Sequence, residues 1–291
     1  MFLDFLMEPR NIRTACWDPQ KAGGYLKERK LDVVYGPINS RRLGLSLGIN
    51  PIQSVGENTL PFACNWSCVY CQYGADGLDE SVKKGRIRFA TLEEIKAGLE
   101  ERLSSNEHYD SVTICGPTEP TISPYFDDIV NLAVEMRDRY RPEIKTSLFT
   151  NATKLRSRNV LPLDYVFMKL DAGNEKTFKR FNRPRGVKFD DLVDELKSAD
   201  VKRRIIQTAV IGGKDGNIED LENGSYVKVI NEINPDEIHL YPLLYRPFPR
   251  FDLSAISREK LESLGEYIRN STDSQVKTFF NPVNIGEEFR F

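Results

Sequence analysis

Apolar and polar residues follow one another along the chain in two recurring patterns. Short runs rich in apolar and β-branched residues predict buried strands, and apolar positions three or four residues apart predict amphipathic helices. The first pattern predicts six strands, at 45–49, 111–114, 145–150, 165–170, 205–211 and 237–243. The second predicts helices that follow Thr91 and Ser123, and further helices near 175–181, 190–197, 226–233 and 258–269.

Two of these helices carry start signals. Thr91-Leu-Glu-Glu94 is a capping box, in which the threonine and the glutamate each satisfy a free backbone N–H group. Ser123-Pro124 predicts an N-cap followed by proline at the first helical position. The apolar stripes of the two helices are Leu92, Ile95, Leu99 and Leu103, and Phe126, Ile129, Val130, Ala133, Met136 and Tyr140.

Strands that alternate with helices predict an α/β fold with a parallel sheet, because a helical crossover is the usual connection between parallel neighbours. The alternation alone does not separate an open sheet from a barrel. No low-complexity tract, sequence repeat or linker divides the 291 residues. We therefore expect a single domain at 1–291, with an N-terminal extension at 1–43, a core at 44–247 and a C-terminal helix and tail at 248–291.

The overall composition excludes some classes of protein. Charged residues make up 29% of the chain, but the formal net charge is only −2, which argues against binding through a global positive field. The five cysteines favour metal ligation in a reducing compartment over a disulfide framework. The first seven residues are too short for a signal peptide, and no apolar run is long enough to span a bilayer. We expect a soluble, cytoplasmic protein that binds no membrane.

Two local basic stretches remain. One interleaves Phe181 with cations, a pattern that suits RNA because rings and guanidinium planes stack on bases. A solvated helix face is the more common explanation of such runs. For His108 and His239, which lie in no recognisable pattern, we expect structural roles. The basic stretches are Lys83, Lys84, Arg86 and Arg88, and Lys179, Arg180, Arg183, Arg185 and Lys188.

Three of the cysteines, Cys64, Cys68 and Cys71, are spaced C-x3-C-x2-C. Three thiolates on one loop suit a [4Fe–4S] cluster, because they ligate three irons and leave the fourth open. Zinc is the main alternative, but a closed structural zinc site needs four ligands, and the next candidates, His108 and Cys115, lie far along the chain. The remaining alternative is a set of buried or free thiols, since cysteine behaves as a small hydrophobic residue.

The loop Cys64-Asn-Trp-Ser-Cys68-Val-Tyr70-Cys71 resembles the cluster-binding motif of the radical S-adenosylmethionine (SAM) superfamily. In that family the aromatic residue before the last cysteine, here Tyr70, lies near the adenine of SAM. A packing residue on the loop is the alternative for Tyr70. The resemblance implies that Cys64, Cys68 and Cys71 hold a [4Fe–4S] cluster.

Two predicted strand ends carry further resemblances. Gly116-Pro-Thr118-Glu119-Pro is similar to the family's G-x-x-E-P motif, whose residues hold the SAM amino group, although Thr118 stands where a second glycine is usual. Thr150-Asn151 is similar to the T-N-G/A strand end that lines the SAM pocket. The alternatives are an ordinary turn with a solvated Glu119, and an Asn151 that caps the next helix.

The fourth predicted strand ends in Lys169 and Asp171, and residues two apart on a strand project to the same side. Opposite charges that point into a barrel mouth are costly to bury unless they pair or engage a ligand. The resemblance implies that both contact the SAM carboxylate and ribose, and a structural ion pair is the alternative.

A longer motif precedes the cysteine loop. The run G-P-x-x-S-R-R-L-G-x-S-L-G, from Gly36 to Gly48, resembles a branch of the superfamily that is loosely grouped with the tRNA wyosine-base synthases. Arginine forks suit carboxylate or phosphate, so Arg41 and Arg42 either hold substrate or anchor the N-terminal segment by ion pairs. Wyosine-base synthases carry extra N-terminal cysteines, whereas this chain has only Cys16 there, and we expect a single cluster.

Together the resemblances imply a partial (β/α)6 TIM-like barrel with N- and C-terminal extensions. All of the strand-end motifs fall where β/α barrels carry their chemistry, which supports the barrel independently.

The resemblances also imply a radical SAM enzyme, an oxidoreductase that cleaves SAM reductively to a 5′-deoxyadenosyl radical and abstracts hydrogen from a substrate. An electron donor such as flavodoxin or ferredoxin is expected. A small metabolite or cofactor precursor is the leading substrate class, and the sequence assigns no further catalytic residue. The alternatives are a tRNA-modifying or glycyl-radical-activating enzyme, and a non-catalytic metal-binding protein.

Overall fold

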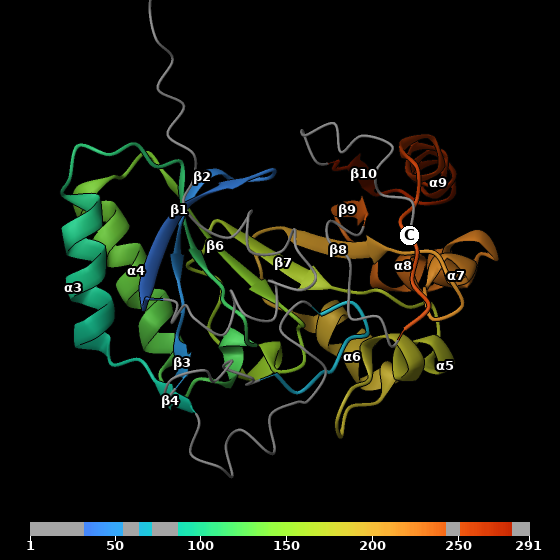
Figure 1. Ribbon diagram of the computed structural model, residues 1–291, viewed down its shortest axis with the longest axis horizontal. Coiled ribbons are helices and arrows are strands. Elements are labelled where there is room, and N and C mark those ends of the chain that lie inside the picture. Colours follow the sequence, from blue (N-terminus) through green and yellow to red (C-terminus); the bar gives the residue numbers. More distant parts are fainter. Residues whose placement is uncertain (1–31, 55–63, 72–86, 243–250, 281–291) are drawn as a thin grey trace, which may run out of the picture.

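A computed structural model describes residues 32–54, 64–71, 87–242 and 251–280. These residues form a mixed α/β structure around one sheet of eight strands in the order β1-β2-β5-β6-β7-β8-β9-β10 (Figure 1). The strands of this sheet are β1 (Val34–Ser40), β2 (Gly44–Ile49), β5 (Ser111–Ile114), β6 (Lys145–Thr150), β7 (Tyr165–Lys169), β8 (Arg204–Val210), β9 (Glu237–Pro242) and β10 (Gln275–Thr278). Two short strands, β3 (Ile52–Ser54) and β4 (Ile87–Phe89), pair separately.

Within the eight-stranded sheet, all neighbouring strands are parallel except β1, which is antiparallel to β2. The six predicted strands are therefore confirmed, within a residue at each end that the structure describes. The sheet also gains β1 and β10, one at each edge, from the segments predicted as extensions. The sequence predicts neither edge strand, because β1 contains Pro37 and only one of the four residues of β10 is apolar.

Helices cover one face of the sheet, with α3 beside α4 at one end and α6, α7 and α8 at the other (Figure 1). None of the helices in the described part of the chain is long and apolar enough to cross a membrane. A π-helical turn at Phe178–Asn182 and short 3-10 turns at Pro120–Ile122 and Leu155–Ser157 complete the connections. The helices are α3 (Leu92–Leu103), α4 (Phe126–Tyr140), α5 (Glu175–Thr177), α6 (Phe189–Ser198), α7 (Ile218–Glu222), α8 (Ser225–Ile233) and α9 (Arg258–Ser271).

One of the two predicted helix starts is confirmed. Thr91 and Glu94 form the reciprocal capping box at α3. The N-cap predicted at Ser123 is wrong, because Ser123 closes the preceding 3-10 turn by donating its N–H to the Pro120 carbonyl at 3.0 Å. Helix α4 therefore begins later, after Tyr125, whose side chain makes no capping bond.

The two faces of the sheet differ in chemistry. Side chains such as Leu47, Ile114 and Leu148 point to the helices and are completely buried in the main core. We call the opposite side the inner face. It carries a polar chain in which Ser46, Thr113 and Ser147 are joined by hydrogen bonds of 2.6 and 2.8 Å. Alternation along the strands brings further polar and aromatic side chains to this face, namely Phe149, Phe167, Lys169, Gln207, His239 and Tyr241.

Candidate functional site

The cysteine loop lies against the segment that follows α5. The backbone N–H groups of Ser67 and Val69 donate to the carbonyls of Asn182 and Phe181, at 3.1 and 2.9 Å. Tyr70 also packs on Phe181, with ring centroids 5.0 Å apart. The π-helical turn is therefore the platform that fixes the loop relative to the sheet.

Two side-chain amides donate to sulfur atoms of the loop. Asn151, just after β6, reaches Cys64 Sγ at 3.7 Å, and Asn182, in the π-helical turn, reaches Cys68 Sγ at 3.5 Å. Burial and, to a smaller extent, the nearby charge of Asp171 raise the pKa of the Cys68 thiol to about 12. A bound metal reverses this preference because it deprotonates a coordinating thiol outright, and the two amides then stabilise the thiolates.

The arrangement of the loop suits a polar cofactor. The three thiols are half-buried, and no three His, Cys, Asp or Glu side chains of the described residues are grouped to hold a single metal ion. A cluster takes its ligands at separate corners, so it accepts thiols that are spread over a loop. Four polar side-chain atoms are also buried without a partner in the described ranges: Trp66 Nε1 and Ser67 Oγ in the loop, Asn182 Oδ1 in the π-helical turn, and Thr118 Oγ1 after β5.

Glu119 joins two strand ends beneath the loop. Its Oε1 accepts from the hydroxyls of Thr150 at 2.6 Å and Thr121 at 2.7 Å, and its Oε2 accepts from the backbone N–H of Asn151 at 2.7 Å. The side chain is buried, and burial raises its pKa even though these hydrogen bonds oppose the shift. The alternative of a solvated Glu119 is therefore wrong.

Asn151 connects the cysteine loop to β6. Its amide group donates to Asn65 Oδ1 at 2.7 Å as well as to Cys64, and its Oδ1 accepts from the backbone N–H of Thr153 at 3.1 Å. The next 3-10 turn has Lys154 at its N-cap, with no side-chain capping bond. Asn151 therefore holds the loop rather than capping the following turn.

Asp171 gathers four donors from four parts of the chain. Tyr70 and Asn182 donate to Oδ2 at 2.6 and 2.7 Å, and the backbone N–H of Ala209 donates to Oδ1 at 2.8 Å. The fourth partner is Lys169, whose Nζ lies 3.2 Å from Oδ1. The ion pair considered from the sequence is therefore present, within a network that ties the loop to β7 and β8.

Lys169 is the cation of this network. Its Nζ also donates to the Tyr241 hydroxyl and lies 5.1 Å from the centre of the Tyr70 ring. Burial alone lowers the pKa of Lys169, but Asp171 and Tyr241 outweigh it, so the net pKa is raised. Lys169 therefore stays charged at neutral pH, on the inner face and next to the cysteine loop.

The predicted residues thus meet at the carboxyl ends of β5, β6 and β7. The sequence did not single out Asn65, Asn182 or Tyr241, because no local motif marks them. Of the basic stretches, 83, 84 and 86 lie outside the described residues, and Arg88 pairs with Glu94 at 2.7 Å. Phe181 is completely buried, so its ring is not available to stack on RNA.

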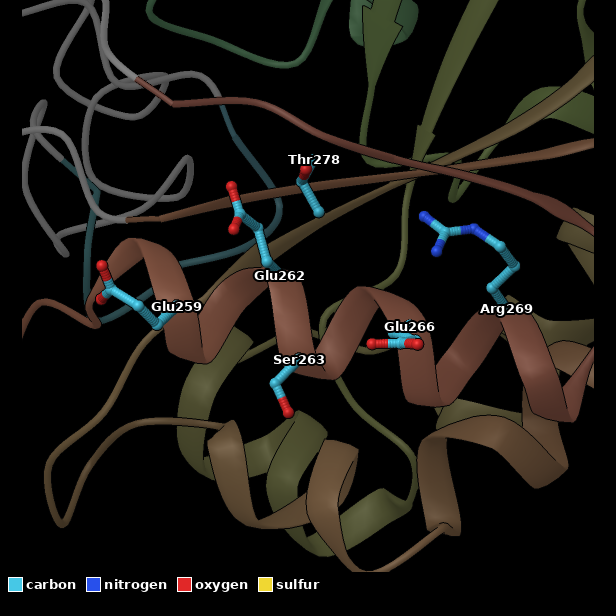
Figure 2. A pocket seen from close by; sticks show the side chains of 6 residues that line it. All are labelled: Glu259, Glu262, Ser263, Glu266, Arg269 and Thr278. Atoms are coloured by element: carbon cyan, nitrogen blue, oxygen red, sulfur yellow. The ribbon is translucent and has the colours of Figure 1, made fainter.

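A surface hollow lies along α9 and β10 (Figure 2). Three of its side chains are glutamates, and none of the residues predicted for the cofactors lines it. Its lining residues are Glu259, Glu262, Ser263, Glu266, Arg269 and Thr278.

The chain is similar in fold to solved radical SAM structures. TYW1 with a lysine-pyruvate adduct bound has a TM-score of 0.56 and 15% identity, over 79% of this chain and 74% of that one. A radical SAM methyltransferase from Sphaerobacter thermophilus has a TM-score of 0.57 and 13% identity, over 82% and 67%. The enzyme anSMEcpe with bound AdoMet has a TM-score of 0.52 and 15% identity, over 80% and 63%. The predicted partial barrel is therefore confirmed.

Curated relatives extend the similarity to sequence. A protein named GTPase Obg from Brachyspira hyodysenteriae is 29% identical over 252 residues, which cover 84% of this chain and 34% of that protein. A UPF0026 protein of Methanocaldococcus jannaschii is 27% identical over 234 residues, 76% of this chain and 66% of its own length. The chain thus spans about a third of the first relative and just under two thirds of the second.

The family comparison matches the Radical SAM superfamily over residues 59–223. This range begins just before the cysteine loop and ends beyond β8. Enzymes of this family bind a [4Fe–4S] cluster and SAM, so both are cofactors of this chain. Because the match covers more than half of the 291 residues, the chain belongs to the radical SAM superfamily of SAM-dependent iron–sulfur enzymes.

Proposed function

We propose that Cys64, Cys68 and Cys71 ligate the cluster, and that the enzyme abstracts a hydrogen atom from a small-molecule substrate. The substrate is held at the inner face, beside the cysteine loop. When bound, the cluster and SAM supply a 5′-deoxyadenosyl radical by reductive cleavage of SAM. The observation that carries the proposal is the pair of amide groups, from Asn151 and Asn182, that donate to two sulfur atoms of the loop. Hydrogen bonds of this kind tune iron–sulfur centres.

We assign the SAM contacts to side chains that can still form a hydrogen bond, an ion pair or a ring contact. Oε2 of Glu119 has one donor among the described residues, so it can accept a second bond from the SAM ammonium. The unpartnered hydroxyl of Thr118 lies one residue away. The charge of Lys169 and the ring of Tyr70 suit the SAM carboxylate and adenine.

Other predicted SAM residues act through their neighbours in this proposal. The polar side-chain atoms of Thr150, Asn151 and Asp171 already bond to protein groups. We assign them the task of positioning Glu119, the cysteine loop and Tyr70. The electron comes from a donor protein such as flavodoxin or ferredoxin.

A small-molecule substrate is favoured over RNA because the one aromatic ring of the second basic stretch, Phe181, is buried beneath the cysteine loop. Some structural neighbours act on other substrates. SuiB from Streptococcus suis, for instance, is bound to a precursor peptide, with a TM-score of 0.51 over 47% of its chain. At 16% identity that likeness concerns the fold alone.

Anaerobic reconstitution tests this function. The chain should take up about four irons and four sulfides and, when reduced with dithionite, convert SAM to 5′-deoxyadenosine. Cys68→Ala should lose the iron. Cys115→Ala is the matched control, because that thiol is half-buried, contacts the Tyr35 hydroxyl at 3.0 Å and is not a proposed cluster ligand. Stoichiometric zinc without iron, or a cluster that never yields 5′-deoxyadenosine, contradicts the proposal.

A further inference from the structure

Arg42 lies in the turn between β1 and β2, and its guanidinium reaches the inner face. Four rings surround it, with centroids 4.7 to 5.8 Å from Cζ. Its Nη1 donates to Gln207 Oε1 at 3.2 Å. The arginine therefore holds a fixed position inside the partial barrel. The rings belong to Phe149, Phe167, Tyr241 and Phe279.

Two nitrogen atoms of this guanidinium have no hydrogen-bond partner among the described residues. They are Nε and Nη2, and both are buried. Their N–H groups point from the same edge of the guanidinium plane, the edge that grips a carboxylate with two parallel hydrogen bonds. Within the described ranges, the structure therefore leaves open the one edge of Arg42 that suits a two-oxygen ligand.

The charge of Arg42 is also unbalanced. Burial lowers its pKa to about 10, so the group remains a cation at neutral pH. Aromatic rings offset part of the cost of burying it, but no carboxylate of the described residues forms an ion pair with it. A buried cation without an anion is strongly unfavourable. An anionic ligand would complete the site.

A second unpartnered group lies in the same region. His239 is buried and packs on Phe167 and Phe279, two of the rings around Arg42, at centroid distances of 5.6 and 4.8 Å. Its Nε2 bonds to Glu237 at 2.7 Å, whereas its Nδ1 is buried without a partner in the described part of the chain. Arg42 and His239, which pack on the same two rings, thus both have buried nitrogen atoms that can bond to a ligand.

We propose that the Nε and Nη2 edge of Arg42 binds a carboxylate of the substrate. The inference rests on the proposed function and adds a substrate class to it, namely small carboxylic acids. The geometry links the two sites: Tyr241 contacts Arg42 on one side and Lys169, beside the cysteine loop, on the other. A carboxylate at Arg42 thus anchors the rest of the substrate towards the cofactors.

The ligand must move a ring to reach this edge, since both nitrogens are closed off in the structure. Phe149, Tyr241 and Phe279 are each only half-buried, so such a movement does not open the main core. Once a ring has moved, the planar carboxylate lies among aromatic rings, and an aromatic carboxylate gains stacking as well.

Calorimetry with phenylacetate as the probe tests the site on the reconstituted holoenzyme. Phenylacetamide serves as the neutral probe of the same shape. Phenylacetate should bind at least tenfold more tightly than phenylacetamide. Arg42→Gln should weaken phenylacetate binding at least tenfold, and Arg42→Lys should also weaken it because an ammonium cannot form the fork. Arg139→Gln is the matched control: its guanidinium also lies over a ring, Tyr140, at 5.3 Å, but on the outer helix α4, and binding should be unchanged.

Equal affinities in wild type and Arg42→Gln overturn the proposal, as do equal affinities for the two probes or no phenylacetate binding to wild type. The last result would mean that water or another part of the chain satisfies Arg42. SAM cleavage by the wild-type enzyme is measured separately on the same preparation. A protein that makes 5′-deoxyadenosine but fails the binding test loses only this inference, whereas one that makes none loses the proposed function.

Discussion

Tyr70 donates a hydrogen bond of 2.6 Å to Asp171, a residue 101 positions later in the chain. This bond links the cysteine loop to the end of β7 and lies next to Cys68 and Lys169. Because Asp171 is completely buried, each of its donors stabilises a charge that water cannot reach.

Removing the hydroxyl in Tyr70→Phe keeps the ring on Phe181 but leaves Asp171 with one donor fewer. A hydrogen bond to a charged group contributes about 1.5–3 kcal/mol, so the free energy of unfolding should fall by about that amount. Denaturant unfolding of the apoprotein measures it. Tyr125→Phe is the control, since that side chain is 45% exposed. A loss no larger than the control's would mean that the bond contributes nothing.

Asn182 gives a second prediction, because its amide donates to both Cys68 and Asp171. In Asn182→Ala the cluster loses one hydrogen bond to a sulfur ligand, and such bonds favour the reduced state. The midpoint potential should become more negative, by the equivalent of about 1 kcal/mol.

A redox titration followed by electron paramagnetic resonance measures this shift. Tyr70→Phe is the comparison variant, since it also removes a donor from Asp171 but none from a sulfur. A potential that shifts equally in both variants would show that the Asp171 network, and not the N–H···S bond, is responsible.

The sheet could be predicted from the sequence where strands are buried on both faces. The bounds of β5 and β6 are those expected from their apolar runs. The edge strand β1 could not be predicted from the sequence, since its Gly36-Pro37 pair is typical of a turn. The π-helical turn Phe178–Asn182 could not be predicted either, because the apolar spacing of 175–181 indicates a helix without distinguishing a π turn from an α turn.

The site was predictable only as far as local motifs extend. The three cysteines are recognisable by their spacing, and Glu119 by the resemblance of its motif together with that cysteine loop. The roles of Asn182 and Tyr241 depend on partners 114 and 72 residues away, and no single-sequence pattern encodes such contacts. For Arg42 the sequence left substrate binding and anchoring equally open, and the choice depends on rings that several strands bring together.

His239 should make stability depend on pH. Burial lowers its pKa from 6.5 to about 4, so the unfolded chain binds a proton at mildly acidic pH that the folded chain does not. The contribution of neutral His239 to the free energy of unfolding is therefore present above pH 6.5 and is lost as the pH falls towards 4. The shift corresponds to on the order of 3 kcal/mol.

His239→Gln keeps a donor for Glu237 but does not titrate. Its free energy of unfolding should fall less steeply than that of wild type between pH 7 and 4. The other histidine, His108, is the control, because its side chain is 73% exposed and His108→Gln should follow wild type. Parallel pH profiles for wild type and His239→Gln would contradict the assignment of a neutral, buried imidazole.

Glu119 has two roles, because it joins the ends of β5 and β6 and is also proposed to bind the SAM ammonium. Glu119→Gln removes the charge proposed to receive the SAM ammonium, and a charge-assisted contact of about 1.5–3 kcal/mol corresponds to a tenfold to hundredfold loss of SAM affinity. The same change replaces one acceptor by a donor. Either the Asn151 N–H or the Thr150 and Thr121 hydroxyls then lose their partner, so stability should fall by about 1–3 kcal/mol as well.

A matched variant separates the two effects. Thr121→Val removes one donor to Glu119 Oε1, at 2.7 Å, and leaves the carboxylate charge in place. Both variants should unfold more easily than wild type, and both should keep their iron, since Glu119 is not a proposed ligand. Only Glu119→Gln should need more SAM to reach half-maximal 5′-deoxyadenosine formation. If the two variants show the same SAM dependence, Glu119 serves only to join β5 to β6, and the SAM ammonium must bind elsewhere.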